Sequence, residues 1–143
     1  MMNYLEVPKK IFLLVEDNSD DIAYILRAIY KSELNIFIQW VETGEEAIDY
    51  LLGIGKYVNR KAYPLPSAII SDNNLSGITG IELLECIRKQ QNLKNIPFTL
   101  MSHSILDIDI NQVTHLGATY YAKDVSIDEY ISMLKNLCKM IPH

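Results

Sequence analysis

The sequence has few cysteines, no basic excess and no long apolar run, and each shortage excludes a class of protein. Its only cysteines, Cys86 and Cys138, form no CxxC pair, which argues against a disulfide scaffold and predicts two reduced thiols in the core. The net charge of −5 argues against nucleic-acid binding, which requires a basic face. No run of about 18 apolar residues occurs, and the N-terminus has no signal-peptide pattern. We therefore expect a cytoplasmic protein without a membrane span.

Histidine is also scarce, whereas apolar residues are abundant. The three histidines, His103, His115 and His143, show no paired metal-ligand spacing, so we expect no zinc site. Apolar residues make up 49% of the 143 residues, which is enough for one packed core. We therefore expect a single domain over residues 1–143, with its core at about residues 9–141.

Five short apolar runs alternate along the chain with five segments of helical spacing. The runs predict strands over residues 10–15, 35–41, 67–71, 96–102 and 118–123. The spacing predicts helices at about 22–29, 43–52, 80–91, 105–116 and 127–141. This order indicates an α/β fold with a parallel sheet between two helical layers. We expect the flavodoxin-like (βα)5 arrangement with strand order 2-1-3-4-5.

Three of the predicted helices have an apolar stripe that should face the core. In the first, the stripe consists of Ile22, Ile25, Leu26 and Ile29; in the fourth, the stripe is thin, with Leu106, Ile110 and Val113. The stripe of the closing helix consists of Ile127, Ile131, Leu134, Cys138 and Ile141.

Polar side chains follow four of the predicted strands at the point where each strand ends. Glu16 and Asp17 follow the first, Asp72 ends the third, Ser102 ends the fourth and Lys123 ends the fifth. The carboxyl ends of parallel strands share one edge of the sheet, where such folds bind their ligands. We therefore expect these five side chains to converge in one acidic pocket.

Clustered carboxylates repel one another and favour a bound cation. Mg²⁺ prefers oxygen ligands at about 2.0–2.1 Å. We expect Asp17 and Asp72 to bind it directly, Glu16 to bind it through water, and Asn74 to offer its backbone carbonyl. Such a site would also suit a phosphoryl group, and Asp72 is then a candidate nucleophile that forms an acyl-phosphate. Ser102 and Lys123 would contact the phosphoryl oxygens.

The chain resembles the receiver domain of two-component response regulators over nearly its whole length. The matching segments are "LLVEDN" with Glu16–Asp17, "IISDNNLSGITG" with Asp72 and Gly80, "IPFTLMS" with Ser102, and "GATYYAK" with Lys123. The long insert "LLGIGKYVNRKAYPLP" resembles that of single-domain receivers of the phytochrome-partner type.

This resemblance implies a stand-alone signalling receiver rather than a conventional enzyme. A histidine kinase or a phosphotransfer protein would phosphorylate Asp72 with Mg²⁺, and the receiver itself would catalyse the transfer and its own dephosphorylation. Ser102 and an aromatic residue on the fifth strand would then switch conformation and signal to a downstream protein. Tyr120 has the family's spacing before Lys123, with Tyr121 as its rival. The chain would act as a monomer or weak homodimer.

Three residues depart from the family's pattern. Ser76 and Asp124 stand where prolines are usual, and His103 stands where a small residue is usual. Without a proline, the Lys123–Asp124 bond should be trans. His103 is a candidate gate that restricts access to Asp72. Asn74 and Ser104 occupy positions that tune hydrolysis in the family.

Two other functions remain open. One is a degenerate receiver that binds proteins without being phosphorylated. The other is a phosphohydrolase with an aspartate nucleophile, although Asn74 stands where such enzymes carry the Asp that acts as general acid. Trp40 is expected to lie away from the site.

Overall fold

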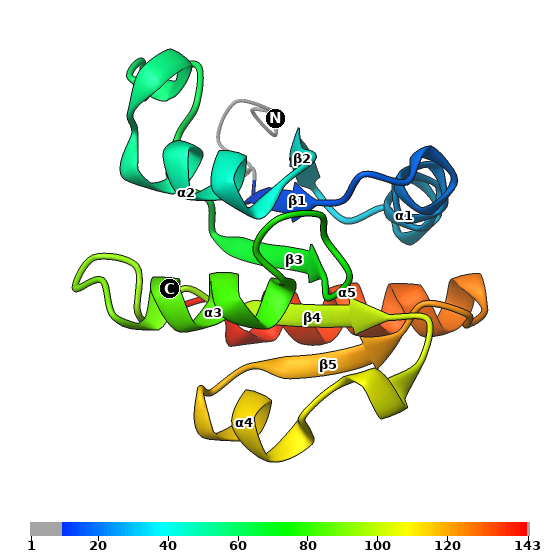
Figure 1. Cartoon of the computed structure of the whole chain (residues 1–143). Coiled ribbons are helices and arrows are strands. Elements are labelled where there is room, and N and C mark those ends of the chain that lie inside the picture. The colour runs from blue at the N-terminus through cyan, green and yellow to red at the C-terminus, as the bar shows by residue number, and fades with distance from the viewer. Residues whose placement is uncertain (1–9, 143) are drawn as a thin grey trace, which may run out of the picture.

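The fold is a three-layer (βα)5 sandwich. The structure is a computed structural model that describes residues 10–142. Residue 9, at the start of the predicted core, and His143 lie outside the described residues. One parallel sheet has the strand order β2-β1-β3-β4-β5, which confirms the predicted flavodoxin-like arrangement (Figure 1).

Strands and helices alternate strictly along the chain. The strands are β1 (Lys10–Val15), β2 (Ile36–Val41), β3 (Ala68–Asp72), β4 (Phe98–Ser102) and β5 (Thr119–Ala122). The α-helices are α1 (Ser19–Ser32), α2 (Gly44–Leu52), α3 (Gly80–Arg88), α4 (Ile110–His115) and α5 (Ile127–Met140).

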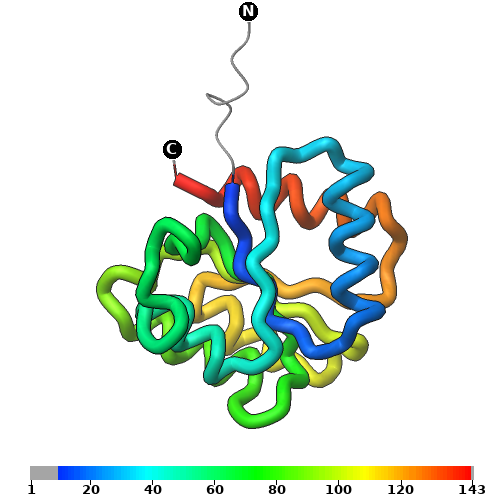
Figure 2. The backbone as a smooth tube through the Cα atoms, turned by 90° about the horizontal axis from the view of Figure 1, so that it is seen from above, coloured from blue at the N-terminus to red at the C-terminus, as the bar shows by residue number. Residues whose placement is uncertain are grey.

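The helices cover both faces of the sheet, with α1 and α5 on one side and α2, α3 and α4 on the other (Figure 2). Successive residues of a strand point to opposite faces, so each strand feeds both cores. In β1, Phe12 and Leu14 pack with α1 and α5, whereas Leu13 and Val15 pack with α2 and α3. A continuous apolar run is therefore what a strand buried on both faces requires.

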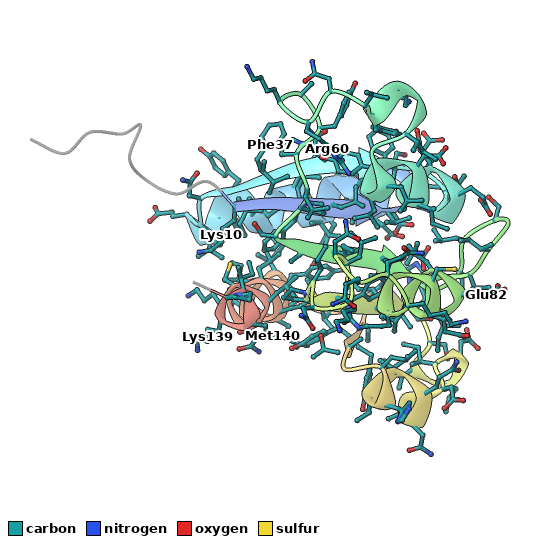
Figure 3. The ribbon with its side chains drawn as sticks, turned by 90° about the vertical axis from the view of Figure 1, so that its left-hand side faces the viewer. Lys10, Phe37, Arg60, Glu82, Lys139 and Met140 are labelled. Carbon is teal, nitrogen blue, oxygen red and sulfur yellow. The ribbon has the colours of Figure 1, made fainter. Side chains whose placement is uncertain are left out.

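The parallel strands all end at the same edge of the sheet, and this positions the candidate site. In Figure 3, Lys10 at the beginning of β1 and Glu82 in the first turn of α3 lie at opposite ends of the molecule. The loops after β1, β3, β4 and β5 therefore meet at the end on which Glu82 lies.

The long segment between α2 and β3 is held by an arginine. It contains a 3₁₀ helix, Gly55–Tyr57. The guanidinium of Arg60 donates hydrogen bonds to the carbonyls of Tyr50 at 2.7 Å and Leu51 at 2.7 Å. These are terminal α2 carbonyls that have no partner within the helix, so Arg60 folds the insert back onto the end of α2.

The predicted helix over 105–116 is wrong in extent. The segment forms a 3₁₀ helix, Ile105–Asp107, and then the short α4. Leu106 is 95% exposed and Ile110 is 40% exposed, so only Val113 of the expected stripe is fully buried. A stripe with one buried side chain gives too little apolar packing to continue the helix.

Several expected core positions are also corrected. Cys86 is exposed and Cys138 is half-buried, so the two thiols are not both core residues. Leu26 is 47% exposed. Of the expected α5 stripe, Leu134 is fully buried, and the other three fully buried α5 side chains are Tyr130, Met133 and Leu137. No helix among residues 10–142 is long and apolar enough to cross a membrane.

Candidate functional site

The ends of β1, β3 and β5 meet in one buried ionic cluster centred on Lys123. Its ammonium nitrogen Nζ lies 2.5 Å from Oε1 of Glu16 and 3.0 Å from Oδ2 of Asp72. The three residues are between 2% and 7% exposed. A lysine this buried needs carboxylate partners, so the structure brings together three of the expected residues in mutual contact.

Asp17 completes an acidic group at the rim of this cluster. Oxygen atoms of Glu16, Asp17 and Asp72 all lie within 4.8 Å of one another, and Asp17 is exposed. Two buried carboxylates and one exposed carboxylate, all offering oxygen, fit a hard divalent cation. Asp17 therefore lies on the solvent side of the acidic group.

Burial and the hydrogen bonds of Lys123 act in opposite directions on the pKa values of the cluster. Burial raises the pKa of Glu16 to about 8, although the hydrogen bond from Lys123 acts in the opposite direction. Burial alone would lower the pKa of Lys123, but hydrogen bonds to Asp21, Glu16 and Asp72 more than offset it and raise that pKa. The cluster therefore holds a charged lysine next to a carboxyl group that resists ionisation, and an added cation would favour its ionised form.

The backbone around Asp72 is fixed by the turn that follows β3. The amide of Asn74 donates to Oδ1 of Asp72 at 3.0 Å, and the amide of Asn73 donates to the carbonyl of Met101 at 2.8 Å. A Cβ atom on Gly80 would lie 2.3 Å from the carbonyl oxygen of Asp72. Only glycine allows this close approach, which is why α3 can begin directly against the Asp72 carbonyl.

Ser102 is fully buried at the end of β4, at the same edge of the sheet as the ionic cluster. Its Oγ accepts a hydrogen bond from the amide of Ser104 at 3.2 Å. Leu100 pairs with Tyr120 and Ser102 pairs with Ala122, so Tyr120 shares a sheet face with Ser102. Tyr120 packs against the α2–α4 core, whereas Tyr121 packs on the opposite face with α5.

Two of the residues that depart from the family pattern contact each other. Nδ1 of His103 lies 3.2 Å from the carboxylate of Asp124, and Nε2 lies 3.5 Å from Oδ2 of Asp21. The His103 side chain is 54% exposed, so its contacts with Asp124 and Asp21 lie at the solvent-exposed rim of the site. No peptide bond between residues 10 and 142 is cis, so the Lys123–Asp124 bond is trans as predicted. Ser76 is exposed in the turn after Asp72.

Sequence reasoning missed Asp21, which is a third partner of Lys123. Its Oδ2 lies 2.8 Å from Nζ of Lys123. Burial alone would raise the pKa of Asp21, but Lys123 lowers it below its ordinary value. The side chain of Asn18 caps α1 by accepting from the amides of Asp20 and Asp21. The cap at Asn18 begins α1 shortly after the end of β1. An acidic residue in the first turn of that helix was therefore a signal that a further carboxylate lies near the site.

Trp40 also lies closer to the site than expected. Its indole Nε1 donates a 2.6 Å hydrogen bond to the backbone carbonyl of Glu16. The expectation that Trp40 lies away from the site is therefore wrong. The parallel pairing of β1 and β2 places Trp40 next to Leu14, and its ring reaches past the strand end.

Comparison with known proteins identifies the family. Residues 12–135 match the response regulator receiver domain. The chain belongs to this family. It is 27% identical to the response regulator Rcp1 of Synechocystis sp. over 132 residues, which cover 91% of this chain and 87% of Rcp1.

Solved structures agree with this assignment. The phosphorylated cyanobacterial phytochrome response regulator RcpA superimposes with a TM-score of 0.79 and 31% identity over 94% of both chains. A Mn²⁺-bound form of Rcp1 has a TM-score of 0.78 at 24% identity, covers 94% of this chain and 99% of that chain, and shows the shared fold. The predicted family and fold are confirmed, and the receiver family supports a signalling role.

Proposed function

We propose that this receiver accepts a phosphoryl group on Asp72 and relays it as a conformational signal. The observation that carries the proposal is the 3.0 Å contact between Nζ of Lys123 and Oδ2 of Asp72, inside an acidic cluster at the ends of parallel strands. A nucleophilic carboxylate beside an ammonium is suited to a reaction in which negative charge accumulates on transferred oxygens.

In the transfer step, a carboxylate oxygen of Asp72 forms a bond to phosphorus. The bond between phosphorus and the donor breaks, and its electron pair leaves with the donor: an imidazole nitrogen of a phosphohistidine or an oxygen of acetyl phosphate. The Lys123 ammonium would donate a hydrogen bond to one phosphoryl oxygen, and the Ser102 hydroxyl would donate to another.

The cation in this proposal is Mg²⁺. Asp17 and Asp72 would bind it directly, Glu16 through water and Asn74 through its backbone carbonyl, and these oxygen donors are the type that Mg²⁺ requires. When bound, Mg²⁺ neutralises charge on the phosphoryl group. Proteins with carboxylate clusters also accept Mn²⁺, so either ion should support the reaction.

The switch in this proposal is Ser102 with Tyr120. An acyl-phosphate can shift the population of two conformers only if it binds one of them better. Inward movement of Ser102 would break the 3.2 Å bond from the Ser104 amide and open space on the sheet face that Tyr120 shares. The signal would then reach a downstream protein through the surface formed by α4, β5 and α5.

The donor and the organisation of the chain complete the proposal. The donor would be a histidine kinase or a phosphotransfer protein, and the similarity to RcpA favours a phytochrome-linked kinase. The family match over residues 12–135 and the coverage of RcpA favour a receiver that works as a single domain. A monomer or a weak homodimer remains part of this proposal.

A phosphodonor assay tests the proposal. The protein is incubated with acetyl phosphate and Mg²⁺, and intact mass is measured for the wild type and for Asp72→Asn. We expect a gain of one phosphoryl mass on the wild type, its loss after treatment with hydroxylamine, which cleaves acyl-phosphates, and no gain on Asp72→Asn. An equal gain on both proteins would place the modification elsewhere.

The two competing functions predict different results with phosphodonors and with phosphate esters. A receiver that binds partners without phosphorylation would gain no mass with any donor, including a phosphorylated kinase. A phosphohydrolase would release inorganic phosphate from phosphate esters with repeated turnover. The exposed Asn74 in the place of a general acid argues against turnover.

A further inference from the structure

The turn after β5, residues 123–125, accepts hydrogen bonds from two tyrosine hydroxyls, one on α5 and one on α1. Tyr130 on α5 donates to the backbone carbonyl of Lys123 at 3.1 Å. Tyr24 on α1 donates to the backbone carbonyl of Val125 at 2.8 Å. The side chain of the residue between them, Asp124, is 73% exposed and does not anchor the turn in the core.

The two tyrosines pack together and link α1, α5 and the turn after β5. Their rings pack edge to face with centroids 5.0 Å apart and an interplanar angle of 70°. Tyr130 is 2% exposed and Tyr24 is partly buried. Edge-to-face packing is a favoured arrangement of aromatic rings, so the contact between the rings joins α1 to α5 and places the two hydroxyls side by side.

The backbone of Lys123 is fixed on both sides. Its amide donates to the carbonyl of Ser102 at 2.9 Å, and its carbonyl accepts from the Val125 amide at 3.0 Å as well as from Tyr130. The Lys123 ammonium reaches Asp72 from this fixed backbone. A shift of the turn would move Nζ with it, and a displacement of about 1 Å can lower a rate by about 100-fold.

We propose that Tyr130 and Tyr24 are positioning residues that set the place of the Lys123 ammonium for phosphoryl transfer to Asp72. The inference rests on the proposed function, and it assigns the tyrosines no contact with the phosphoryl group. Tyr130 has the larger role because its hydroxyl bonds the Lys123 carbonyl directly, whereas Tyr24 acts on Val125, two residues further along.

Three variants test the proposal: Tyr130→Phe, Tyr24→Phe and the control Tyr50→Phe. Tyr50 is 1% exposed, and its hydroxyl donates to the carbonyl of Pro64 at 2.8 Å, on the far side of the sheet. The control therefore removes a buried hydroxyl–carbonyl hydrogen bond of the same kind without touching the turn after β5.

The measured quantities are the maximal rate of phosphorylation by saturating acetyl phosphate, the dissociation constant for Mg²⁺ and the thermal midpoint. We expect Tyr130→Phe to lower the maximal rate by between about 10-fold and 100-fold and Tyr24→Phe to lower it less. The dissociation constant should change less than the rate, because the two hydroxyls bond to backbone carbonyls and not to Glu16, Asp17 or Asp72. Tyr50→Phe should lower the thermal midpoint and leave the rate unchanged.

Two results would overturn the proposal. One is an unchanged rate for Tyr130→Phe; the other is an equal loss of rate for Tyr50→Phe, which would indicate a general structural effect. If the wild type takes up no phosphoryl group, the proposed function fails and the positioning is read from the ¹⁵N resonance of the Lys123 ammonium. A shift in Tyr130→Phe that is absent in Tyr50→Phe would support the positioning role, and an unchanged resonance would contradict it.

Discussion

Nζ of Lys123 lies 2.8 Å from Oδ2 of Asp21, so the lysine is bound to a carboxylate that is not part of the cation cluster. A contact that holds Lys123 in the resting state and weakens during transfer raises the barrier. We therefore expect Asp21→Asn to speed phosphorylation of Asp72 by acetyl phosphate by up to about tenfold, which corresponds to about 1.4 kcal/mol.

The neighbouring residue Asp20 provides the control for this variant. It lies in the same first turn of α1, is exposed, and Asp20→Asn makes the same change in charge. Its rate should match that of the wild type. A slower reaction for Asp21→Asn would mean that Asp21 holds Lys123 in its productive place, and the prediction would then be wrong.

The hydrogen bond from Trp40 to the Glu16 carbonyl makes the indole a reporter of the acidic cluster. We expect Mg²⁺ to change the emission of Trp40 in a saturable way, because an ion bound beside Glu16 and Asp17 would place two positive charges near the indole. Asp17→Asn should weaken binding at least about tenfold, since it removes one of few charged ligands. Fluorescence titration, checked by calorimetry, measures both. Asp128→Asn, an exposed change on α5, should bind Mg²⁺ like the wild type.

His103 bridges the loop after β4 to Asp124 and to Asp21 at the rim of the pocket. If the ring restricts access to Asp72, His103→Ala should raise the rate of phosphorylation by acetyl phosphate severalfold. Asp124→Ala should have a smaller effect of the same sign, because it removes one of the two contacts of the ring. His115→Ala, at the far end of α4, is the control. An unchanged rate in His103→Ala would show that the ring is not a gate.

Gly80 is the first residue of α3 and Gly44 is the first residue of α2. The two positions therefore allow a direct comparison of what a Gly→Ala change costs in protein stability. A Cβ on Gly80 would meet the backbone oxygen of Asp72 at 2.3 Å, whereas one on Gly44 would meet the side chain of Ile78 at 2.4 Å. Side chains can move more readily than backbone, so Gly80→Ala should cost about 1–3 kcal/mol and Gly44→Ala less. Urea unfolding measures both, and equal costs would contradict the argument.

Most of the fold could be predicted from local pattern. Apolar runs with both faces buried, such as 10–15, read directly as strands, and the alternation with amphipathic helices leaves few topologies. The error at 105–116 has a physical cause: a hydrophobic spacing does not show which side chains find partners, and Leu106 finds none in the core. Helix ends such as that of α3, at Arg88 rather than residue 91, depend on local competition that a pattern does not encode.

The candidate site was predictable where its residues follow strand ends, as Asp72 and Lys123 do. Asp21 was missed because it lies in the first turn of α1 and not at a strand end, and its contact with Lys123 depends on how α1 is oriented over the sheet. Tyr24 and Tyr130 were beyond sequence reasoning for a similar reason. The bond of Tyr24 joins residues 101 positions apart and depends on the packing of α1 on α5, whereas the bond of Tyr130 spans 7 positions and depends on how α5 folds back on the turn before it.

The buried hydroxyl of Tyr50 makes the free energy of unfolding depend on pH in the alkaline range. Burial raises the pKa of Tyr50 from 10.0 to about 12. Between these values the folded state holds a proton that the unfolded state has lost, so the free energy of unfolding falls as pH rises. The contribution of Tyr50 is fully present below about pH 10 and is lost toward pH 12, with a slope of at most about 1.4 kcal/mol per pH unit.

Urea unfolding between about pH 9.5 and 11.5 tests this dependence. Tyr50→Phe should be less stable than the wild type at neutral pH, because it loses the bond to the Pro64 carbonyl. Its stability should nevertheless fall less steeply as pH rises, since the titrating hydroxyl is gone. Tyr30 is 86% exposed, so unfolding changes its surroundings little and Tyr30→Phe should keep the wild-type slope. Identical slopes for Tyr50→Phe and the wild type would show that the alkaline loss of stability arises from other groups.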